Sequence, residues 1–313
     1  MGVLFSVIIP TYNGEKTIGK LLNRLCILGT THYSIEIIII DSSSTDNTSQ
    51  IVESYQRKTP FIKFVKIKKK DFNHGGTRNL GVKMAKGKYV CFFSQDAVPT
   101  AKSDFFKYFL EDFSISKRVV AVFGKQVPHL DTPFIQKIEQ AKIFNELEKY
   151  ASRGLVIQDI DLPFVKFSAD TMLAWYGLFN PFACYKKSFL NKNPFSLVVY
   201  GEDLIMGKEI IEQKLVKIYD SRCKVIHSHK YNIFEYYKRQ KNDLFLKLKY
   251  VNFSSNYSIF SWKLHAIFSS NEKIYRKIYY VGILFIYYLI KFIILLEFKL
   301  QKMFFKSLLV NGN

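Results

Sequence analysis

Short, nearly continuous apolar runs alternate with helix-like segments up to Gly124, and this alternation constrains the fold more than any other feature. Val3–Ile9, Ile35–Ile40 and Tyr89–Phe93 have the length and composition of buried strands. Between the first two, apolar residues recur over Ile18–Leu25 with the i, i+3, i+4, i+7 spacing of an amphipathic helix. This order of elements predicts a mostly parallel sheet with right-handed crossovers.

The same kind of pattern predicts further elements on both sides of Gly124. Before it, Phe61–Lys68 alternates as an edge strand would, Phe105–Leu110 marks a helix and Val119–Phe123 is a strand. After it, the predicted elements are a helix over Pro133–Tyr150, a loop over Leu155–Asp170, a strand over Phe195–Tyr200, a helix over Gly201–Gln213 and a strand over Val225–His229. The remainder is basic, aromatic and helical.

Polar residues stand where several of these strands end. They are Thr11, Tyr12 and Asn13 after the first strand, Asp41 after the second, and Ser94, Gln95 and Asp96 after the third. Ligands of open α/β sheets bind outside the carboxyl ends of the strands, so we expect these loops to meet in one site. Their carboxylates and the nearby Arg78 suit a sugar nucleotide with a metal ion.

A glycine-rich segment, Gly75-Gly76-Thr77-Arg78, opens a predicted helix. Free N–H groups at a helix N-terminus bind anions, and an arginine in the first turn can fork onto a diphosphate. The alternative is a glycine-rich turn with a solvated arginine. The segment is neither GxGxxG after a first strand nor a P-loop, so it does not predict dinucleotide binding.

Three carboxylates are candidates for chemistry. Asp96 ends a buried strand, where it can hold Mg²⁺ or Mn²⁺ or simply cap the next helix. Glu202 and Asp203 precede an apolar helix pattern. Two crowded carboxylates can raise the pKa of one and make it a base, although acids at a helix start also favour the helix dipole.

Two histidines and a group of aromatic residues complete the candidates. His227 and His229 lie two residues apart after a predicted strand, so both imidazoles share one face, suited to a metal or a phosphate. Surface histidines are the alternative. Trp175, with Tyr176 and Phe179, is a candidate for stacking on an acceptor sugar, although such aromatic residues are more often core.

Charge is concentrated in the last third of the chain. The net charge is +20, and Ser221–Asn313 holds 16 basic against 4 acidic residues. Such a region can face nucleic acid or an anionic membrane. The four cysteines form no CxxC pair, so we expect reduced thiols, and the start of the chain lacks the pattern of a signal peptide.

In combination, these motifs resemble the family 2 glycosyltransferases, which are inverting enzymes with the GT-A fold. The resemblance covers about residues 3–230 and rests on their order along the chain: Ser6–Asn13, Glu36–Asp46, the Gly-x-x-x-Arg-Asn-x-Gly segment ending at Gly81, Ala85–Val90, the Asp96 loop and Glu202-Asp203. It implies a catalytic domain over 1–230 and a basic, aromatic helical region over 231–313. It also implies that Asp203, beside Glu202, is the catalytic base.

Within that family, the segments Phe72–Asn79, Ser94–Ala97 and His227–His229 look like those of bacterial rhamnosyltransferases. The resemblance implies a dTDP-L-rhamnose donor and a lipid-linked acceptor in O-antigen or capsule synthesis. It also implies that the enzyme lies at the inner face of the cell membrane and has no nucleic-acid partner. The implied donor-binding residues are Thr11, Tyr12, Asn13, Asp41, Gly75, Gly76, Arg78, Gln95 and Asp96.

The sequence departs from the family pattern at two positions. The usual metal-binding DxD is reduced to Ser94-Gln95-Asp96, so Asp96 keeps the only carboxylate, and the resemblance adds His227, with His229 as a further candidate ligand. Ser42 replaces the usual second Asp after Asp41. Three other hypotheses stay open: a UDP- or GDP-sugar donor, a non-catalytic sugar-nucleotide-binding protein, and a basic nucleic-acid-binding protein.

An apolar, tyrosine-rich segment near the C-terminus adds a membrane hypothesis. Ile278–Ile290 is uncharged, Lys291 interrupts the segment, and Phe292–Leu296 continues it. A spanning helix needs about 20 apolar residues, a length reached only if Lys291 is tolerated. Tyrosine and basic residues at its flanks favour the membrane interface, so we expect an in-plane or packed helix in preference to a span.

Overall fold

The computed structural model describes residues 2–31, 33–100, 104–160, 174–250 and 259–310. The chain divides into two compact units, each formed from two stretches of sequence. The first unit contains Met1–Leu130 and Lys142–Ser228, and the second contains Asp131–Ala141 and His229–Asn313.

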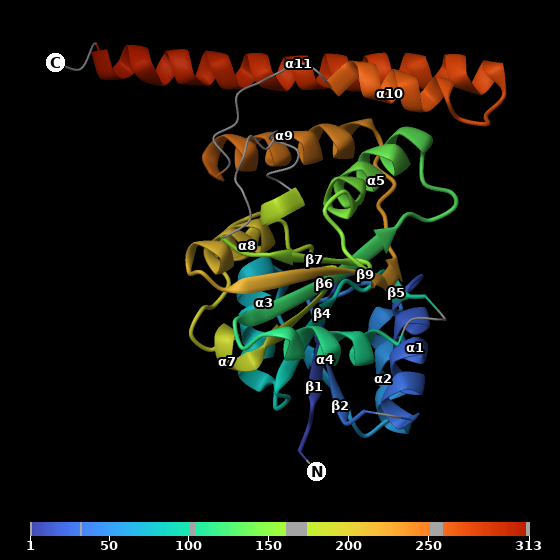
Figure 1. The fold of residues 1–313 in the computed structure, drawn as a ribbon, viewed down its shortest axis with the longest axis vertical. Helices are drawn as coiled ribbons and strands as arrows, with labels where there is room; N and C mark the ends of the chain where they lie inside the picture. The colour runs from blue at the N-terminus through green and yellow to red at the C-terminus, as the bar shows by residue number, and fades with distance from the viewer. Residues whose placement is uncertain (1, 32, 101–103, 161–173, 251–258, 311–313) are drawn as a thin grey trace. The chain divides into compact units, whose positions relative to one another are not determined.

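The first half of the sheet in the first unit is parallel, as the sequence predicts. β1 (Phe5–Thr11) pairs with β2 (Ile35–Asp41) and β4 (Tyr89–Phe93), and β2 pairs with β3 (Ile62–Lys66) (Figure 1). The β1–β2 register places Thr11 opposite Asp41. The carboxyl ends of these strands therefore meet at one edge of the sheet, where the polar loops begin.

The second half of the sheet mixes strand directions. β8 (Phe182–Lys186) is antiparallel to β4 and to β6 (Val119–Val127), and β6 is parallel to β9 (Val216–Ile226). The short strands β5 (Val98–Pro99) and β7 (Leu155–Gln158) are antiparallel to β9. Within the described residues the sheet has nine strands in the order β3-β2-β1-β4-β8-β6-β9-β5, and β7 pairs with β9.

Helices cover both faces of this sheet, because alternate residues of each strand enter different apolar cores. Val7 and Ile9 pack in one core, while Ile8 between them packs in the other. The first core includes residues of α1 (Ile18–Thr31), α2 (Thr48–Lys58) and α4 (Phe105–Ile115). The second includes residues of α3 (His74–Met84), the end of α5 (Phe134–Glu148), α7 (Lys187–Leu190) and α8 (Glu202–Glu212).

Three local predictions are wrong. Phe195–Tyr200 is not a strand: Leu197 and Val199 are exposed, and the backbone groups of Phe195 bond the side chain of Asn79 instead of a strand. The predicted loop over 155–170 begins with β7, and residues 161–170 lie outside the described part of the chain. The last strand begins at Val216, earlier than predicted, because the buried Lys217 and Asp220 hide its apolar pattern.

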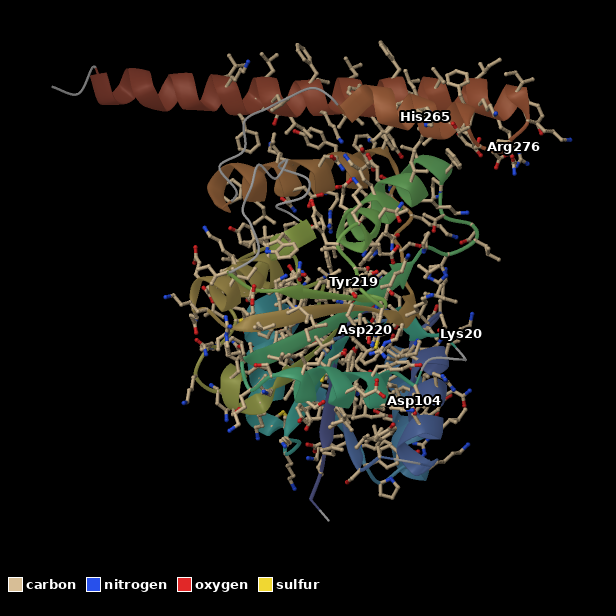
Figure 2. All side chains as sticks on the ribbon, viewed as in Figure 1. Lys20, Asp104, Tyr219, Asp220, His265 and Arg276 are labelled. Atoms are coloured by element: carbon tan, nitrogen blue, oxygen red, sulfur yellow. The ribbon has the colours of Figure 1, made fainter. Side chains whose placement is uncertain are left out.

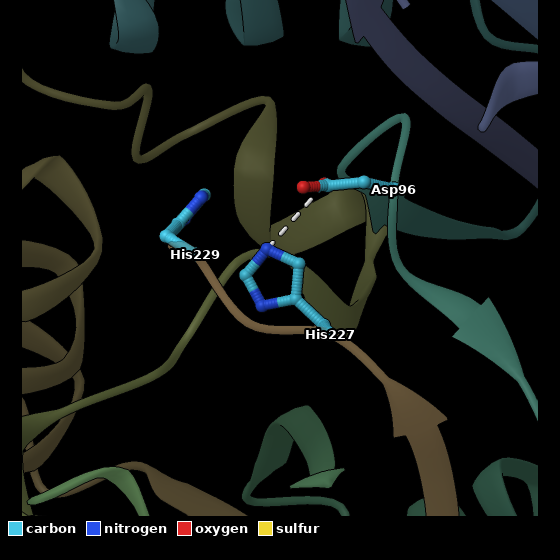
Figure 3. A group of neighbouring side chains, drawn as sticks. All are labelled: Asp96, His227 and His229. Carbon is cyan, nitrogen blue, oxygen red and sulfur yellow. Dashed lines mark ion pairs between the residues drawn. The ribbon is translucent and has the colours of Figure 1, made fainter. Parts of the chain in front are cut away.

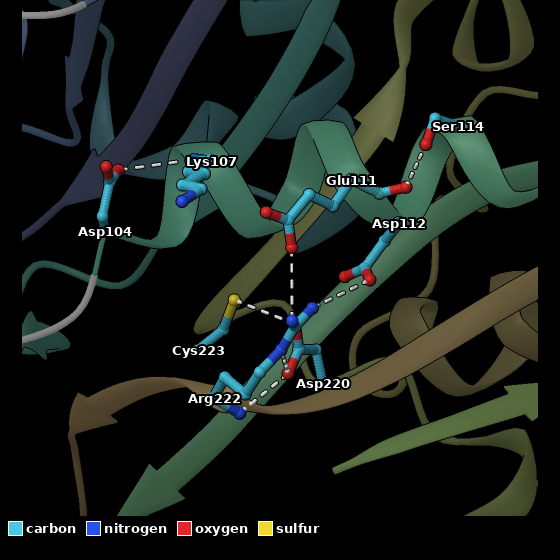
Figure 4. Close-up of polar contacts among 8 residues, drawn as sticks. All are labelled: Asp104, Lys107, Glu111, Asp112, Ser114, Asp220, Arg222 and Cys223. Atoms are coloured by element: carbon cyan, nitrogen blue, oxygen red, sulfur yellow. Dashed lines mark hydrogen bonds and ion pairs between the residues drawn. The ribbon is translucent and has the colours of Figure 1, made fainter. Parts of the chain in front are cut away.

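A cluster of carboxylates around Arg222 joins α4 to β9 (Figure 4). The guanidinium contacts Asp112 at 3.4 Å, Asp220 at 2.9 Å and Glu111 at 3.2 Å. Asp112 and Asp220 are fully buried, and Asp220 lies within the first unit on its sheet (Figure 2). Burial and the charge of Asp220 raise the pKa of Asp112 to about 8, although Arg222 opposes the shift.

We expect this cluster to make stability depend on pH. The unfolded-state pKa of Asp112 is about 4, so the folded state binds the additional proton between about pH 4 and 8, and its contribution is lost as the pH rises through 8. Asp112→Asn mimics the protonated acid, so above pH 8 it should raise the unfolding temperature by about 2–4 °C.

The advantage of Asp112→Asn should shrink toward pH 5, as measured by thermal unfolding at several pH values. Asp131→Asn, which changes an exposed carboxylate, is the matched control and should show no such trend. An equal shift at pH 5 and pH 9 would contradict the proposed titration of Asp112.

The second unit is helical in its described residues. It contains the beginning of α5 up to Ala141, α9 (Ile233–Tyr250), α10 (Ile259–Phe268) and α11 (Ile274–Val310). These helices share a small apolar core, whose buried members are Ile135, Tyr236, Ile267, Leu284 and Tyr287. The rings of Tyr236 and Tyr287 stack at 3.7 Å, which ties α9 to α11.

Candidate active site

The loops after β1 and β2 are held together by Asp41, which is 1% exposed. Its carboxylate accepts hydrogen bonds from Thr11 Oγ1 at 3.1 Å, from the backbone N of Ser44 at 3.0 Å, and from Ser44 Oγ. Asn13, at φ 48°, donates its backbone N–H to Ser44 Oγ and accepts from Thr45 N. Thr11, Asn13 and Asp41 therefore lie close together. The buried Asp41 carboxylate supports the two loops through its hydrogen bonds to Thr11 and Ser44.

Gln95 joins the loop after β4 to the loop after β1. Its side-chain amide makes two bonds with the backbone of Tyr12: Oε1 accepts from Tyr12 N, and Nε2 donates to Tyr12 O, both at 3.0 Å. Lys69, in the 3₁₀ turn η1 (Lys69–Asp71), donates to the phenolic oxygen of Tyr12 at 2.6 Å. Tyr12 and Gln95, both predicted to bind the donor, are thus held together by these hydrogen bonds.

Asp96, in the loop after β4, and His227, directly after β9, face each other (Figure 3). His227 Nε2 lies 3.4 Å from Asp96 Oδ1, and the imidazole is buried while the carboxylate is partly exposed. Gln126 Oε1 lies 2.8 Å from His227 Nδ1, which orients the imidazole with Nε2 toward Asp96. Ligand atoms of His227 and His229 and a carboxylate oxygen of Asp96 all lie within 4.8 Å of one another.

This donor set fits a divalent cation. Two ligand atoms that each lie about 2.1 Å from one ion are separated by roughly 3–3.4 Å, which is the spacing of Asp96 and His227. Gln126, which the sequence analysis missed, supplies the outer contact that metal-ligating histidines generally have. A candidate divalent-metal site is therefore present, with a carboxylate and two imidazoles as its ligands.

The N-terminus of α3 does not have the open form that its sequence predicts. Asn73 caps it by accepting from Gly76 N at 2.9 Å, and the Asn73 amide donates to Val198 O at 3.0 Å. A Cβ on Gly75 would lie 2.2 Å from the carbonyl oxygen of Ser196. Gly75 is therefore required by the chain that packs against it, because a side chain there would collide with backbone.

Arg78 makes contacts that the sequence does not predict. It is 7% exposed, and its guanidinium bonds Glu202 Oε1 at 2.8 Å and the carbonyl oxygen of His74 at 3.0 Å. Glu202 itself is 5% exposed. Arg78 is thus not solvated. Its guanidinium joins α3 to α8 through a buried ion pair, and a buried charge is tolerated only when it is paired this closely.

Asp203, next to Glu202, remains partly exposed at the start of α8. Gly201 precedes it at φ 85°, a left-handed conformation that favours glycine. Asp203 Oδ2 accepts from Asn180 N at 3.3 Å, and Oδ1 accepts from its neighbour Leu204 N at 2.9 Å. Burial and then the charge of Glu202 raise the pKa of Asp203, which is the shift expected of a general base.

Asn180 connects Asp203 to the loop that carries Asp96, and the sequence analysis missed it. Its Oδ1 accepts from the buried hydroxyl of Tyr185 at 2.7 Å, while the next residue, Pro181, accepts from Ser94 N at 3.2 Å. The Asn180-Pro181 segment therefore bonds Asp203 on one side and the Asp96 loop on the other. The Asn-Pro dipeptide is a turn signal that could have drawn attention to it.

Trp175 is not available to an acceptor sugar. It is 1% exposed and packs in the second core of the first unit, and Tyr176 and Phe179 pack against the same core. The buried ammonium of Lys217 donates to the carbonyl oxygens of Trp175 and Gly177 and to Gln158, which fixes this segment. The prediction of sugar stacking by Trp175 is therefore wrong, since its ring has no open face.

A cavity of about 360 Å³ lies beside α3 and includes Gly76 of the predicted donor motif. Its other lining residues, from β3, the residues after it and α3, are Lys66, Ile67, Lys68, Asp71, Thr77 and Leu80. Two lysines and an aspartate give this cavity a polar wall. It is the open side of the glycine-rich motif, whose first glycine is covered by Ser196.

Comparison with known proteins identifies the class that this fold and site define. The family model "Glycosyl transferase family 2" matches residues 6–164, and the chain belongs to that family. The O-antigen chain rhamnosyltransferase RfbN of Salmonella typhimurium is 32% identical over 237 residues, covering 75% of this chain and 69% of that protein. WbaN of Salmonella anatum, with the same description, is 30% identical with the same coverage. The protein is thus a glycosyltransferase, as expected.

Solved structures confirm the fold class. The mannosyltransferase PcManGT from Pyrobaculum calidifontis, in complex with GDP-Man and Mn²⁺, aligns with a TM-score of 0.55 at 15% identity, covering 80% of this chain and 65% of that one. S. aureus TarS 1–349 in complex with UDP gives 0.51 at 18% identity, covering 88% and 68%. The expected GT-A fold with a mostly parallel sheet is therefore confirmed, and as a family 2 transferase the chain uses a nucleotide-sugar donor.

Proposed function

We propose that this enzyme transfers L-rhamnose from dTDP-L-rhamnose to a lipid-linked glycan in O-antigen or capsule synthesis, at the inner face of the cell membrane. The sugar is supported by the two relatives described as rhamnosyltransferases, which align over 75% of the chain. The chemistry rests on one observation: the Asn180-Pro181 segment bonds both Asp203 and the loop of Asp96. A base and a candidate metal ligand thus belong to one constellation.

Asp203 is the general base of this proposal. It takes the proton of an acceptor hydroxyl while that oxygen bonds to the anomeric carbon of the donor. The bond from that carbon to the diphosphate oxygen breaks on the opposite side, its electrons leave with the nucleotide, and the configuration inverts. The bonds from Asn180 N and Leu204 N hold the carboxylate in place, and its raised pKa brings its basicity closer to neutral pH.

Asp96 and His227 are the residues that would hold Mg²⁺ or Mn²⁺, with His229 as a third ligand. Such an ion, when bound, neutralises charge on a leaving diphosphate. Ser94 stands where the family's usual motif has a second carboxylate, so the set relies on imidazole nitrogen. Gln126 holds the His227 ring with Nε2 toward Asp96, which is the orientation that ligation requires.

Arg78 and Glu202 are positioning residues in this proposal. Their buried ion pair fixes the first turn of α8, where Asp203 stands next to Glu202. The positive charge of Arg78 also opposes the effect of Glu202 on the pKa of Asp203. The loops of Thr11, Tyr12, Asn13, Asp41 and Gln95 bind the nucleotide, together with Gly76 on the wall of the cavity.

Binding of free nucleoside diphosphates tests the donor. With Mg²⁺ present, calorimetry should give a dTDP dissociation constant at least about threefold below that of dUDP, which lacks only the methyl group, because burying one methyl group contributes roughly 0.8 kcal/mol. UDP, which also carries a 2′-hydroxyl, should bind more weakly than dTDP. GDP should bind more weakly still. Tighter binding of UDP or GDP would contradict the rhamnose donor and favour a UDP- or GDP-sugar. If none of these nucleotides binds, the proposed dTDP-sugar donor is contradicted.

A further inference from the structure

The helix α11 has two different faces within the second unit. By length and composition, Ile274–Leu300 is the one helix in the described part of the chain that could cross a membrane. Yet Leu284, Tyr287 and Ile294 are buried, at the i, i+3, i+10 positions of a single stripe. The opposite stripe is exposed and apolar, and its members are Ile274, Ile278, Phe285, Leu289, Phe292, Leu296 and Leu300.

Charges on this helix are confined to its inner side and its ends. Between Ile278 and Phe298 the only charged residues are Lys291 and Glu297. Lys291 Nζ lies 3.7 Å from Glu139 of α5, and Glu297 accepts from Lys241 of α9 at 2.7 Å. Both charged groups are therefore matched by partners inside the second unit, and neither interrupts the exposed apolar stripe.

Glu139 is the centre of the polar contacts beneath α11. Besides contacting Lys291, it accepts a hydrogen bond from Tyr236 at 3.0 Å and forms an ion pair with the buried Lys263 of α10. Gln136, one turn earlier on α5, donates to the hydroxyl of Tyr287 at 3.0 Å. A helix surrounded by lipid would lose these contacts and place charged and polar groups in hydrocarbon, which is costly.

The ends of the exposed stripe are basic. Lys273 is exposed just before it, Arg276 is exposed between its first two members, Lys299 is exposed at its far end, and Lys302 and Lys306 follow in the sequence. Tyr275 and Tyr279 are exposed beside the first basic residues. A long apolar face with basic residues at both ends and tyrosines at the first matches a bilayer interface with anionic headgroups, because apolar and charged groups then each contact their preferred layer.

We propose that α11 lies flat in the interface of an anionic bilayer, with the exposed stripe in the acyl region and the Glu139 contacts holding its other face to the protein. The helix segment Ile274–Leu300 would lie about 40 Å along the membrane surface. The inference rests on the proposed function only in that a lipid-linked acceptor occupies the same surface. It requires no particular donor sugar.

Vesicle flotation with the full-length protein tests the surface. Vesicles of phosphatidylcholine with about one-third phosphatidylglycerol should carry the protein upward, and Leu289→Glu with Phe292→Glu should weaken that partition by at least about tenfold. Ile27→Glu with Ile115→Glu changes two equally exposed apolar residues of the first unit and should have no effect. A second pair, Leu289→Ser with Phe292→Ser, should also weaken partition and guards against misfolding of the first.

Labelling from one side of the membrane distinguishes a flat helix from a spanning one. In a Cys26→Ser background, whose remaining cysteines are buried, Arg276→Cys and Lys299→Cys report the two ends of the stripe. An impermeant maleimide should label both ends from the same side of sealed membranes. Labelling from opposite sides would overturn the proposal in favour of a span.

Two further outcomes separate this inference from others. If the wild-type protein ignores vesicles but dimerises, and Leu289→Glu with Phe292→Glu makes it monomeric, a second copy covers the stripe and the proposal is wrong. Nucleotide binding, measured separately, tests the proposed function. If the protein binds vesicles but does not bind dTDP, the proposed membrane contact of α11 is supported and only the proposed dTDP-sugar donor is contradicted.

Discussion

We expect Asp203→Asn to lower turnover by roughly 10²–10⁴-fold, the usual cost of removing a positioned general base. The amide keeps the shape of the side chain but cannot take a proton from the acceptor hydroxyl. Binding of dTDP should stay within about twofold of wild type, because the change is confined to proton transfer. Initial rates with a saturating donor, together with calorimetry, measure both quantities.

The pH profile gives a second readout for Asp203. Because burial and Glu202 raise its pKa, the acidic limb of kcat/KM should lie above the ordinary range of an aspartate, with activity rising as the carboxylate ionises. Glu212→Gln, at the exposed end of the same helix, is the matched control and should keep wild-type turnover. Turnover of Asp203→Asn within a few-fold of wild type would remove Asp203 from this role.

Asp96→Ala should abolish the metal dependence of donor binding. Asp96 supplies the only carboxylate of the candidate ligand set, so its loss should reduce activity by at least about 10²-fold, given that a bound metal contributes several kcal/mol to charge stabilisation. In calorimetry, Mn²⁺ should strengthen dTDP binding to the wild type and leave that of the variant unchanged. Manganese EPR gives an independent measure of ion binding.

A graded variant sharpens this test. Gln126→Leu removes the contact that orients His227 without touching a ligand atom, and should weaken metal affinity by about 10–100-fold. Asp243→Ala changes a surface carboxylate of α9 and should leave Mn²⁺ binding as in wild type. If dTDP binds equally with Mn²⁺ and with EDTA, the assignment of Asp96 and His227 to a metal is contradicted.

The parallel half of the sheet was predictable because its strands are nearly continuous apolar runs whose polar ends carry the motifs. β8 was missed because Phe182–Lys186 is short and its strand character comes from pairing with β4 and β6, which are distant in the sequence. Phe195–Tyr200 was misread for the opposite reason: its residues have the composition of a strand, but the side chains of Asn73 and Asn79 bond its backbone carbonyls.

The sequence predicted which residues belong to the site better than it predicted which residues they contact. Motif order brought Asp96 and His227 forward, and the structure places them 3.4 Å apart. No spacing rule connects Arg78 to Glu202, so the sequence favoured a phosphate as the partner of that guanidinium. Asn180 carries no family motif, and its importance follows only from the two bonds that its segment makes.

The interleaving of the two units limits how this gene can be cut or extended. A stop codon after Ser228 would delete α9 to α11 but keep Asp131–Ala141, the stretch that belongs with them. Ile135, now 1% exposed, would lose its apolar neighbours, and Glu139 would lose Lys263 and Lys291. Any recombination that exchanges the C-terminal helices for others must therefore replace an internal segment at the same time, so the two stretches are expected to be inherited together.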